Sequence, residues 1–478
     1  MGACDLFPLL PVIIIAFTAV FVMFMGALRQ DRITAFAAAL CGYVLSFAST
    51  LLFVPGTPLV HRITPLIVMD GYGLFYIDLI LAASMAVVIL SYDYLKMYAA
   101  RVEEYYVLLL TATLGAMILA VSGHFASFFL GLETLSLSLY VLVAYLHTRS
   151  RHIEAAIKYL ILSAVSTAFL LFGMALIYYR LGSMEFSGIS IKMASALAGD
   201  LAVFAGTLMV IAGIGFKLAL VPFHMWAPDV YEGAPTPVTA YISTISKGAV
   251  FAVFLRYFRE IDIPEQTSLF IILSIIAVAS MFAGNFLALF QNNVKRLLAY
   301  SSIAQVGYLL VGFLSSGPLR VVSVTYYLVA YFVMTVGAFG IITLLAGKND
   351  DADFIDTYAG LFFVRPWLAV AFTLMLLSLA GMPLTMGLIG KFYIFAAGVA
   401  SGLWFLVIVL VVNSILGLYY YLRVISVMFL RSPTGATKIS LRPSRAGRLV
   451  VVVLMVLLVW LGVYPASLVS VIEKMIGS

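Results

Sequence analysis

The chain carries long runs of apolar residues, joined by short polar connections. A helix needs about 20 mainly apolar residues to cross a bilayer, and many of these runs reach that length. Of the 478 residues, 64% are hydrophobic and 10% are charged, whereas a soluble domain has roughly 25% charged residues. Such a composition cannot cover a surface exposed to water, so we predict one polytopic membrane domain over residues 1–478.

The apolar runs predict fourteen membrane spans. Backbone polar groups in lipid must be paired within the protein, so only helices and closed barrels can cross the membrane. Runs of this length without two-residue alternation favour helices. The expected fold is therefore all-α and polytopic, with spans at residues 8–28, 33–55, 70–94, 105–122, 124–146, 153–180, 200–221, 234–257, 267–290, 296–315, 318–347, 367–397, 402–430 and 447–470.

The distribution of lysine and arginine predicts the orientation of the chain. If the N-terminus lies outside, the inside segments carry 16 of these residues and the outside segments carry 7. The positive-inside rule then places both termini on the outer side. The connection between the last two spans supplies six of the 16, so the prediction depends strongly on one loop.

Several classes of function have no support in the sequence. The two cysteines, Cys4 and Cys41, show no spacing typical of a metal site or a disulfide framework. The chain has no CxxC, P-loop or dinucleotide-binding fingerprint. In a membrane protein the net charge of +6 does not indicate nucleic-acid binding. The first residues lack the basic region of a cleavable signal, so we expect them to begin the first span.

Five ionisable residues lie inside predicted spans. A charged side chain at mid-bilayer costs about 2.5–3.5 kcal/mol, so such residues face protein or internal water and are usually functional. The alternative is that they only hold helices together. For Lys158, which lies closest to the inner boundary, an ordinary ion pair with Glu154 four positions earlier is as plausible as a functional role. The five residues are Glu133, Lys158, Lys217, Lys247 and Lys391.

Two spans contain proline and glycine beside a lysine. Lys217 is followed by Pro222 and further helix-breaking residues, and Lys391 follows the segment Gly381–Gly387, which contains Pro383. Proline removes a backbone donor and interrupts a helix. The first interruption is either a break within the membrane or a plain turn at its edge. Interrupted spans at corresponding places in two halves are typical of inverted-repeat transporters. We therefore expect repeats at residues 105–257 and 267–430, flanked by 1–94 and 447–478.

Other polar residues give weaker signals. Thr239, Ser243 and Ser246 precede Lys247, and their hydroxyls could hold water beside its ammonium group. A stripe of polar side chains inside the span at 296–315 is better explained by helix packing. Lys295 and Arg296 are expected to be ordinary anchors at the inner surface, and Asp78 has no identifiable partner. The stripe consists of Tyr300, Ser301, Gln305 and Tyr308.

Buried lysines with a carboxylate and no redox motif suggest proton handling. Burial favours the neutral form of lysine and a nearby carboxylate favours the charged form, so a moving carboxylate can load and unload it. Arginine would stay charged throughout. Because the residues lie on several helices, water must bridge the gaps between them.

At these residues the chain resembles the antiporter-like subunits of respiratory complex I, the NADH–quinone oxidoreductase. The resemblance covers essentially the whole chain, and "AAIKYLILSAVSTAFLLFGMALIYY" favours the subunit N branch. The other stretches that carry it are "FKLALVPFHMWAPDVYEGAPTPVTAYISTISKGA", "VKRLLAYSSIAQVGYLL" and "LAGMPLTMGLIGKFYIF".

The resemblance implies a proton channel in the membrane arm of a bacterial inner-membrane complex. In the family pattern Glu133 pairs with Lys217, Lys247 is the connecting lysine, Lys391 is the terminal one, and Lys158 matches a position near the inner side. The implied partners are a neighbouring antiporter-like subunit, small membrane subunits and lipid. NADH, flavin, iron–sulfur clusters and quinone are expected in partner subunits, with no cofactor or metal in this chain and no nucleic acid bound.

Two other functions remain open at this point. The chain could belong to a multi-subunit Na+/H+ antiporter or a related membrane-bound hydrogenase. It could also be a structural scaffold whose inner charges only fix helix packing.

Overall fold

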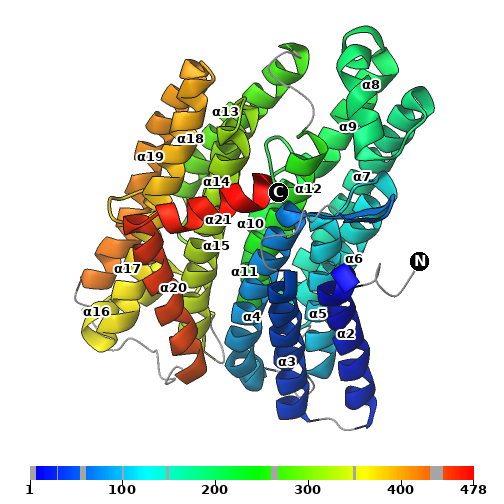
Figure 1. Cartoon of the computed structure of the whole chain (residues 1–478). Helices are drawn as coiled ribbons and strands as arrows, with labels where there is room; N and C mark the ends of the chain where they lie inside the picture. Colours follow the sequence, from blue (N-terminus) through cyan, green and yellow to red (C-terminus); the bar gives the residue numbers. More distant parts are fainter. Residues whose placement is uncertain are drawn as a thin grey trace.

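The computed structural model describes residues 7–28, 31–53, 61–98, 102–146, 150–259, 267–347, 351–430 and 445–477. Its helices form one bundle in which the two halves of the chain lie side by side (Figure 1). Within these residues, 13 helices are long and apolar enough to cross a membrane. The fold is that of an all-α polytopic membrane protein, as the sequence predicts.

The first half of the chain is helical apart from one short hairpin. A two-stranded antiparallel sheet, β1 (His61–Thr64) and β2 (Ile67–Met69), precedes the third span. The helices are α2 (Leu10–Leu28), α3 (Arg32–Thr50), α4 (Gly71–Tyr98), α5 (Glu103–Ala120), α6 (Phe125–Val143), α7 (Ser150–Leu181), α8 (Phe186–Gly199), α9 (Leu201–Leu218), α10 (Trp226–Gly233), α11 (Thr236–Tyr241), the π-helix η3 (Ile242–Ser246) and α12 (Lys247–Tyr257), with short 3-10 turns at η1 (Phe7–Leu9) and η2 (Leu51–Phe53).

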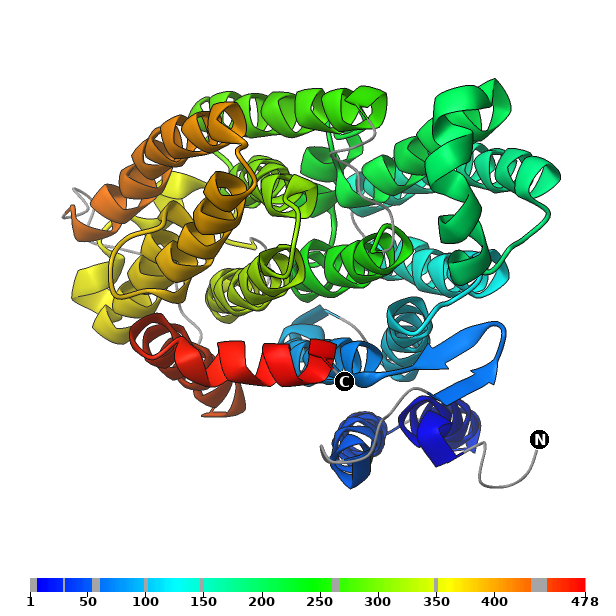
Figure 2. The same cartoon turned by 45° about the horizontal axis from the view of Figure 1, so that its top comes forward.

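The second half repeats long helices with one interruption. Figure 2 shows α2 and α3, in dark blue, at one edge of the bundle, and the last helix, in red, lying across other helices. The elements are α13 (Thr267–Leu289), α14 (Val294–Leu314), α15 (Leu319–Leu345), η5 (Ile355–Tyr358), α16 (Leu361–Val364), α17 (Pro366–Ala380), α18 (Met386–Ala400), α19 (Trp404–Phe429), α20 (Arg445–Val463) and α21 (Ala466–Gly477).

The fourteen predicted spans correspond to these helices one by one. The span at 367–397 is the one that falls into two short helices, α17 and α18, and the other thirteen each contain a long apolar helix. The span at 447–470 ends earlier than expected, at Val463, because Pro465 separates α20 from α21. The hairpin and α8 had no signal in the apolar pattern. Cys4 lies outside the described residues, as do Arg431, Lys438 and Arg442 of the loop that dominates the charge count.

One end of the bundle is built around the hairpin, and we call it the hairpin end. Ile67 of β2 pairs with Ser122 after α5, and His124 pairs with Glu185 before α8. The chain alternates direction, so the starts of α4 and α9 and the ends of α7 and α12 also lie there. At the opposite end, α7 and α14 begin.

Both interruptions begin at a residue in the left-handed conformation. Ala219, the residue after α9, has φ of 59°, and Gly381, the residue after α17, has φ of 90°. After Ala219 the chain turns and forms α10, and Ala219 and Leu220 are fully buried. The segment between α9 and α10 therefore begins in the interior, at Ala219 and Leu220, and then reaches the exposed Pro222 and Met225.

Glycines allow the broken helix α18 to pack tightly on α17. A β-carbon on Gly387 would lie 1.9 Å from the backbone oxygen of Ser378, far inside van der Waals contact. Small residues at such contacts are what allows membrane helices to approach closely. No other residue type can occupy this position without moving the two half-helices apart.

We predict that Gly387→Ala destabilises the protein, because overpacking costs about 1–3 kcal/mol or more when backbone must move. The measurement is the thermal inactivation temperature and yield of the purified host complex. Gly199→Ala is the matched control, since nothing lies within 4 Å of a β-carbon there. Equal behaviour of the two variants would contradict the packing argument.

Candidate functional site: buried lysines along the bundle

Lys217 lies in the last turn of α9, directly before the first interruption, and is 5% exposed. Its Nζ donates to Ser136 Oγ at 2.7 Å and to Ser163 Oγ at 2.5 Å. The hydroxyl of Tyr140 donates to Ser163 at 2.5 Å, and its ring centre lies 6.0 Å from the ammonium. The ammonium group is thus held by neutral hydroxyls from α6 and α7.

Glu133 lies one turn from Ser136 on α6 and is half-buried. Its carboxylate accepts a hydrogen bond from Thr167 Oγ1 at 2.8 Å. Thr167 and Ser163 are four residues apart on α7 and therefore share a face. Hydroxyl side chains separate Glu133 from Lys217, and the direct ion pair implied by the family pattern is not formed in the described residues.

Lys247 is the first residue of α12, immediately after the π-helix η3, and is 2% exposed. Its Nζ donates to Ser302 Oγ of α14 at 2.7 Å and lies 5.5 Å from the ring centre of Tyr231. The sequence suggested Ser243 as a neighbour at helical spacing, but Ser243 donates to the Ala240 carbonyl. A π-helix has a wider turn, which changes the face that each residue occupies.

Lys391 reaches back from α18 to the broken end of α17 and is 6% exposed. Its Nζ donates to the carbonyls of Leu379 and Ala380 and to Ser414 Oγ, all at 3.0 Å. The ring centre of Tyr308 lies 5.1 Å away. The carbonyls at a helix C-terminus carry partial negative charge and so stabilise a cation.

Side chains of α14 form a hydrogen-bonded chain toward Lys391, and in the described residues no hydrogen bond joins this chain to Ser302 beside Lys247. Next to Ser302, the hydroxyl of Ser301 shares a hydrogen bond of 2.5 Å with Tyr421. Gln305 Nε2 donates to Tyr421 at 3.4 Å and to the Leu379 carbonyl at 3.1 Å, and this carbonyl also accepts from Lys391. The polar stripe on α14, which packing alone could explain, is therefore part of a hydrogen-bonded chain.

Lys158 differs from the other four candidates. Its side chain is 44% exposed and is paired with Glu154 at 2.8 Å and Asp229 at 2.9 Å. These pairs belong to a network at the end opposite the hairpin, which we call the ion cluster. It joins α7, α10, α14 and the segment before η5, and consists of Arg151, Glu154, Lys158, Asp229, Glu232, Lys295, Arg296, Asp351 and Asp353.

Lys295 is the buried centre of the ion cluster, so the prediction that it is an ordinary surface anchor is wrong. Its side chain is 1% exposed and contacts Asp351 at 3.1 Å and Asp353 at 3.0 Å. Burial raises the pKa of the Asp353 carboxyl above its ordinary value, and Lys295 opposes this shift. Tyr94 of α4 also donates to Asp351. The acidic partners lie more than 50 positions along the chain, where sequence spacing gives no signal.

Asp78 accepts a hydrogen bond from Thr50 Oγ1 at 2.6 Å, between α4 and α3. The sequence could not identify this partner, because it lies on a different helix 28 positions earlier. Asp78 is separate from the lysine chain, which lies on α9, α12, α14 and α18.

A helical membrane bundle with two broken helices and a series of buried lysines defines the antiporter-like class of membrane subunits. Residues 122–417 match the family described as NADH:quinone oxidoreductase/Mrp antiporter, transmembrane. The chain is 50% identical to NADH-quinone oxidoreductase subunit N of Nitrosospira multiformis, over 98% of this chain and 96% of that one. The chain belongs to this family and, within it, to the subunit N proteins.

Solved structures agree with this assignment. A chain of respiratory complex I from Thermus thermophilus is 31% identical, with a TM-score of 0.80 over 96% of this chain and 98% of that one. A chain of the Mrp complex from Dietzia sp. DQ12-45-1b shares the fold, with a TM-score of 0.86, 20% identity and coverage of 99% and 97% of the two chains.

We predict that Lys295→Ala and Lys158→Ala differ sharply in stability. Removing Lys295 takes the buried cation away from Asp351 and Asp353, of which Asp353 keeps its contact with Arg151, and such a loss costs about 3–5 kcal/mol. The exposed pairs of Lys158 contribute about 0–1 kcal/mol. Thermal inactivation of the two purified complexes measures the difference, and a larger loss for Lys158→Ala would refute it.

Proposed function

We propose that this chain translocates protons as a membrane-arm subunit of NADH–quinone oxidoreductase. NADH, flavin, iron–sulfur and quinone chemistry belong, in this proposal, to partner subunits, and this chain supplies the proton path. It works beside a neighbouring antiporter-like subunit and small membrane subunits in a bacterial inner membrane. The hairpin end and both termini face outward.

The environment of three of the buried lysines carries the proposal. Within the described residues, the ammonium groups of Lys217, Lys247 and Lys391 donate hydrogen bonds to hydroxyls and carbonyls and each lies near an aromatic ring, with no carboxylate within ion-pair distance. An amine with neutral partners can give up its proton without leaving a buried carboxylate unpaired. Lys295, with two carboxylate partners, has no such freedom. The presence or absence of carboxylate partners therefore distinguishes the three lysines proposed to carry protons from Lys295, which has a structural role.

The proposed order of proton transfer follows the geometry. Glu133 and Lys217 form the entry group, joined across the hydroxyl layer of Ser163 and Thr167. Lys247 and Lys391 exchange the proton along α14, where water bridges the gap between Ser302 and the hydrogen-bonded chain that starts at Ser301. We find no hydrogen bond in the described residues between the Lys217 and Lys247 groups, so transfer there requires water or motion of the broken helix. Lys158 lies in the ion cluster, at the end of the bundle where protons enter in this proposal, and has a secondary role in proton transfer.

We also propose that α5–α12 and α13–α19 are inverted repeats. Two features support it. Each half contains one broken helix whose first part ends at a left-handed residue. In each half the first two helices touch through a glycine, Gly115 against the α6 backbone and Gly284 against the α14 backbone.

We predict that Glu133→Gln and Lys217→Met in the assembled complex lower coupled quinone reduction by about tenfold or more, since losing a proton-transfer group typically costs 10²–10⁴-fold in that step. Proton pumping and NADH oxidation in sealed vesicles are measured together. Lys192→Met, an exposed lysine on α8, is the matched control. Normal turnover with an unchanged proton-to-electron ratio would remove both residues from the path. Sodium uptake that replaces proton release would favour a Na+/H+ antiporter.

Lys247→Arg tests whether the amine must release its proton. Arginine keeps the positive charge and donors but does not deprotonate in proteins. We expect a complex that assembles fully and pumps several-fold fewer protons per electron. Recovery of normal pumping in this variant would show that Lys247 acts only as a fixed charge.

A further inference from the structure

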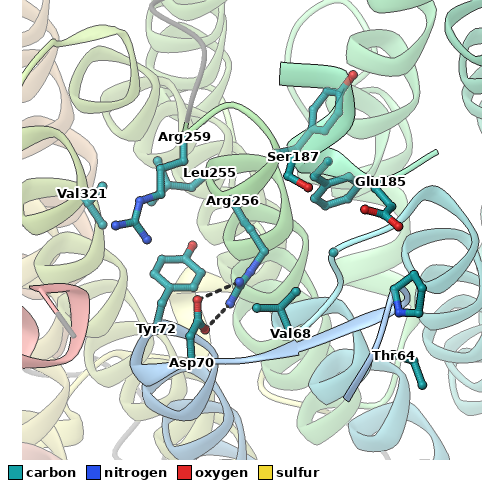
Figure 3. A pocket seen from close by; sticks show the side chains of 14 residues that line it. Thr64, Val68, Asp70, Tyr72, Glu185, Ser187, Leu255, Arg256, Arg259 and Val321 are labelled. Atoms are coloured by element: carbon teal, nitrogen blue, oxygen red, sulfur yellow. Dashed lines mark hydrogen bonds and ion pairs between the residues drawn. The ribbon is translucent and has the colours of Figure 1, made fainter. Parts of the chain in front are cut away.

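A cavity of about 570 Å³ opens at the hairpin end of the bundle (Figure 3). The hairpin, the start of α8, the end of α12 and Val321 of α15 line it. Four charged residues line it, Asp70, Glu185, Arg256 and Arg259. Two of them meet, Asp70 before α4 and Arg256 in the last turn of α12. None of the lysines discussed above lines this cavity.

Asp70 and Arg256 form a bidentate ion pair. Arg256 Nη1 contacts Asp70 Oδ2 at 2.9 Å, and Nη2 contacts Oδ1 at 2.7 Å. The Arg256 side chain is 11% exposed and the Asp70 side chain 15%. The guanidinium lies 4.8 Å from the ring centre of Tyr72, and the Gly73 amide donates to Asp70 at 2.7 Å. The pair is therefore fixed in position by α4, as Figure 3 shows.

The pair is mechanically connected to a translocating lysine. Lys247 begins α12 and Arg256 lies nine residues later, which is about 13 Å along the same helix. The π-helix η3 immediately precedes Lys247. π-helices are frequent at functional sites and lack the regular α-helical register. A shift of α12 that accompanies proton loss at Lys247 would move Arg256 relative to Asp70.

We propose that this cavity is the outer mouth of the proton path and that the Asp70–Arg256 pair is its gate. A fixed guanidinium is an electrostatic barrier to protons and other cations, as in selective membrane pores. While the pair is closed, protons outside do not reach Lys247. When α12 moves, the guanidinium leaves and the proton passes outward through the cavity. Asp70 and Arg256 are thus positioning residues, and the proposal rests on the proposed function above.

The test is passive proton permeability, which a purely structural ion pair would not control. Complexes with Asp70→Asn or Arg256→Gln are reconstituted into lipid vesicles, and proton entry is followed with a pH dye under an imposed gradient without NADH. We expect proton entry to rise about tenfold, equivalent to a barrier about 1.4 kcal/mol lower, and Asp70→Glu to restore tightness. Arg256→Gln tests the same barrier if Asp70→Asn assembles poorly.

Two control variants distinguish a leak through an opened gate from a leak caused by damage to the protein. Arg180→Gln removes an ion pair with Asp200 at the same end of the bundle, outside the cavity, and should leave the vesicles tight. Adding Lys247→Met to Asp70→Asn should abolish the leak if it follows the lysine path.

Vesicles with Asp70→Asn and Arg256→Gln that are as tight as the unmodified complex would overturn the gate. So would a leak that persists in the Asp70→Asn, Lys247→Met double variant. The proposed function fails separately, through an unchanged proton-to-electron ratio in Lys217→Met alone.

Discussion

The free-energy cost of an ammonium group away from water determines how this bundle is built. A lysine at mid-membrane is tolerated only where donors and acceptors replace its hydration. The three buried lysines proposed to carry protons have different neutral partners: two serines for Lys217, one serine and a tyrosine ring for Lys247, and two carbonyls and a serine for Lys391. In each case the partners are neutral, so the charge is accommodated without being fixed.

The broken helices follow from this requirement. In the interior of a helix each backbone carbonyl accepts a hydrogen bond from the same helix. At the end of α17 the carbonyls of Leu379 and Ala380 lack such a partner and accept hydrogen bonds from Lys391 instead. The left-handed Gly381 creates that end, and Gly387 allows the second half-helix to bring Lys391 back over it. The proline and glycine residues thus supply ligands as well as bends. In the first half, the interruption after Lys217 places α10 where Tyr231 contacts Lys247.

The sequence predicts features whose physical cause is local. Hydropathy defines the spans because each must be apolar along its own length, and Pro383 with its glycines marks a break for similar reasons. A lysine in an apolar run is visible without any partner. Partners on other helices are not visible, because their distance along the chain is arbitrary. The sequence could therefore not assign Ser163, Ser302 or the two aspartates of Lys295. For Lys158 it left an ordinary pair with Glu154 and a translocating role equally open, until the exposure of the side chain was known.

The contrast between Lys295 and Lys247 shows why one helix can serve both stability and transport. Lys295 belongs to α14 and Lys247 contacts it, and both side chains are almost completely buried. Lys295 lies at the start of α14 and is held by two carboxylates, which ties this end of the helix to the ion cluster. Ser302, seven residues or about two turns further along, offers only a hydroxyl to Lys247. A helix anchored at one end by full charges can keep its hydroxyls in place while a neighbouring amine changes its charge. Because Lys295 and its two aspartates lie outside the proposed path, these fixed charges do not trap the moving proton.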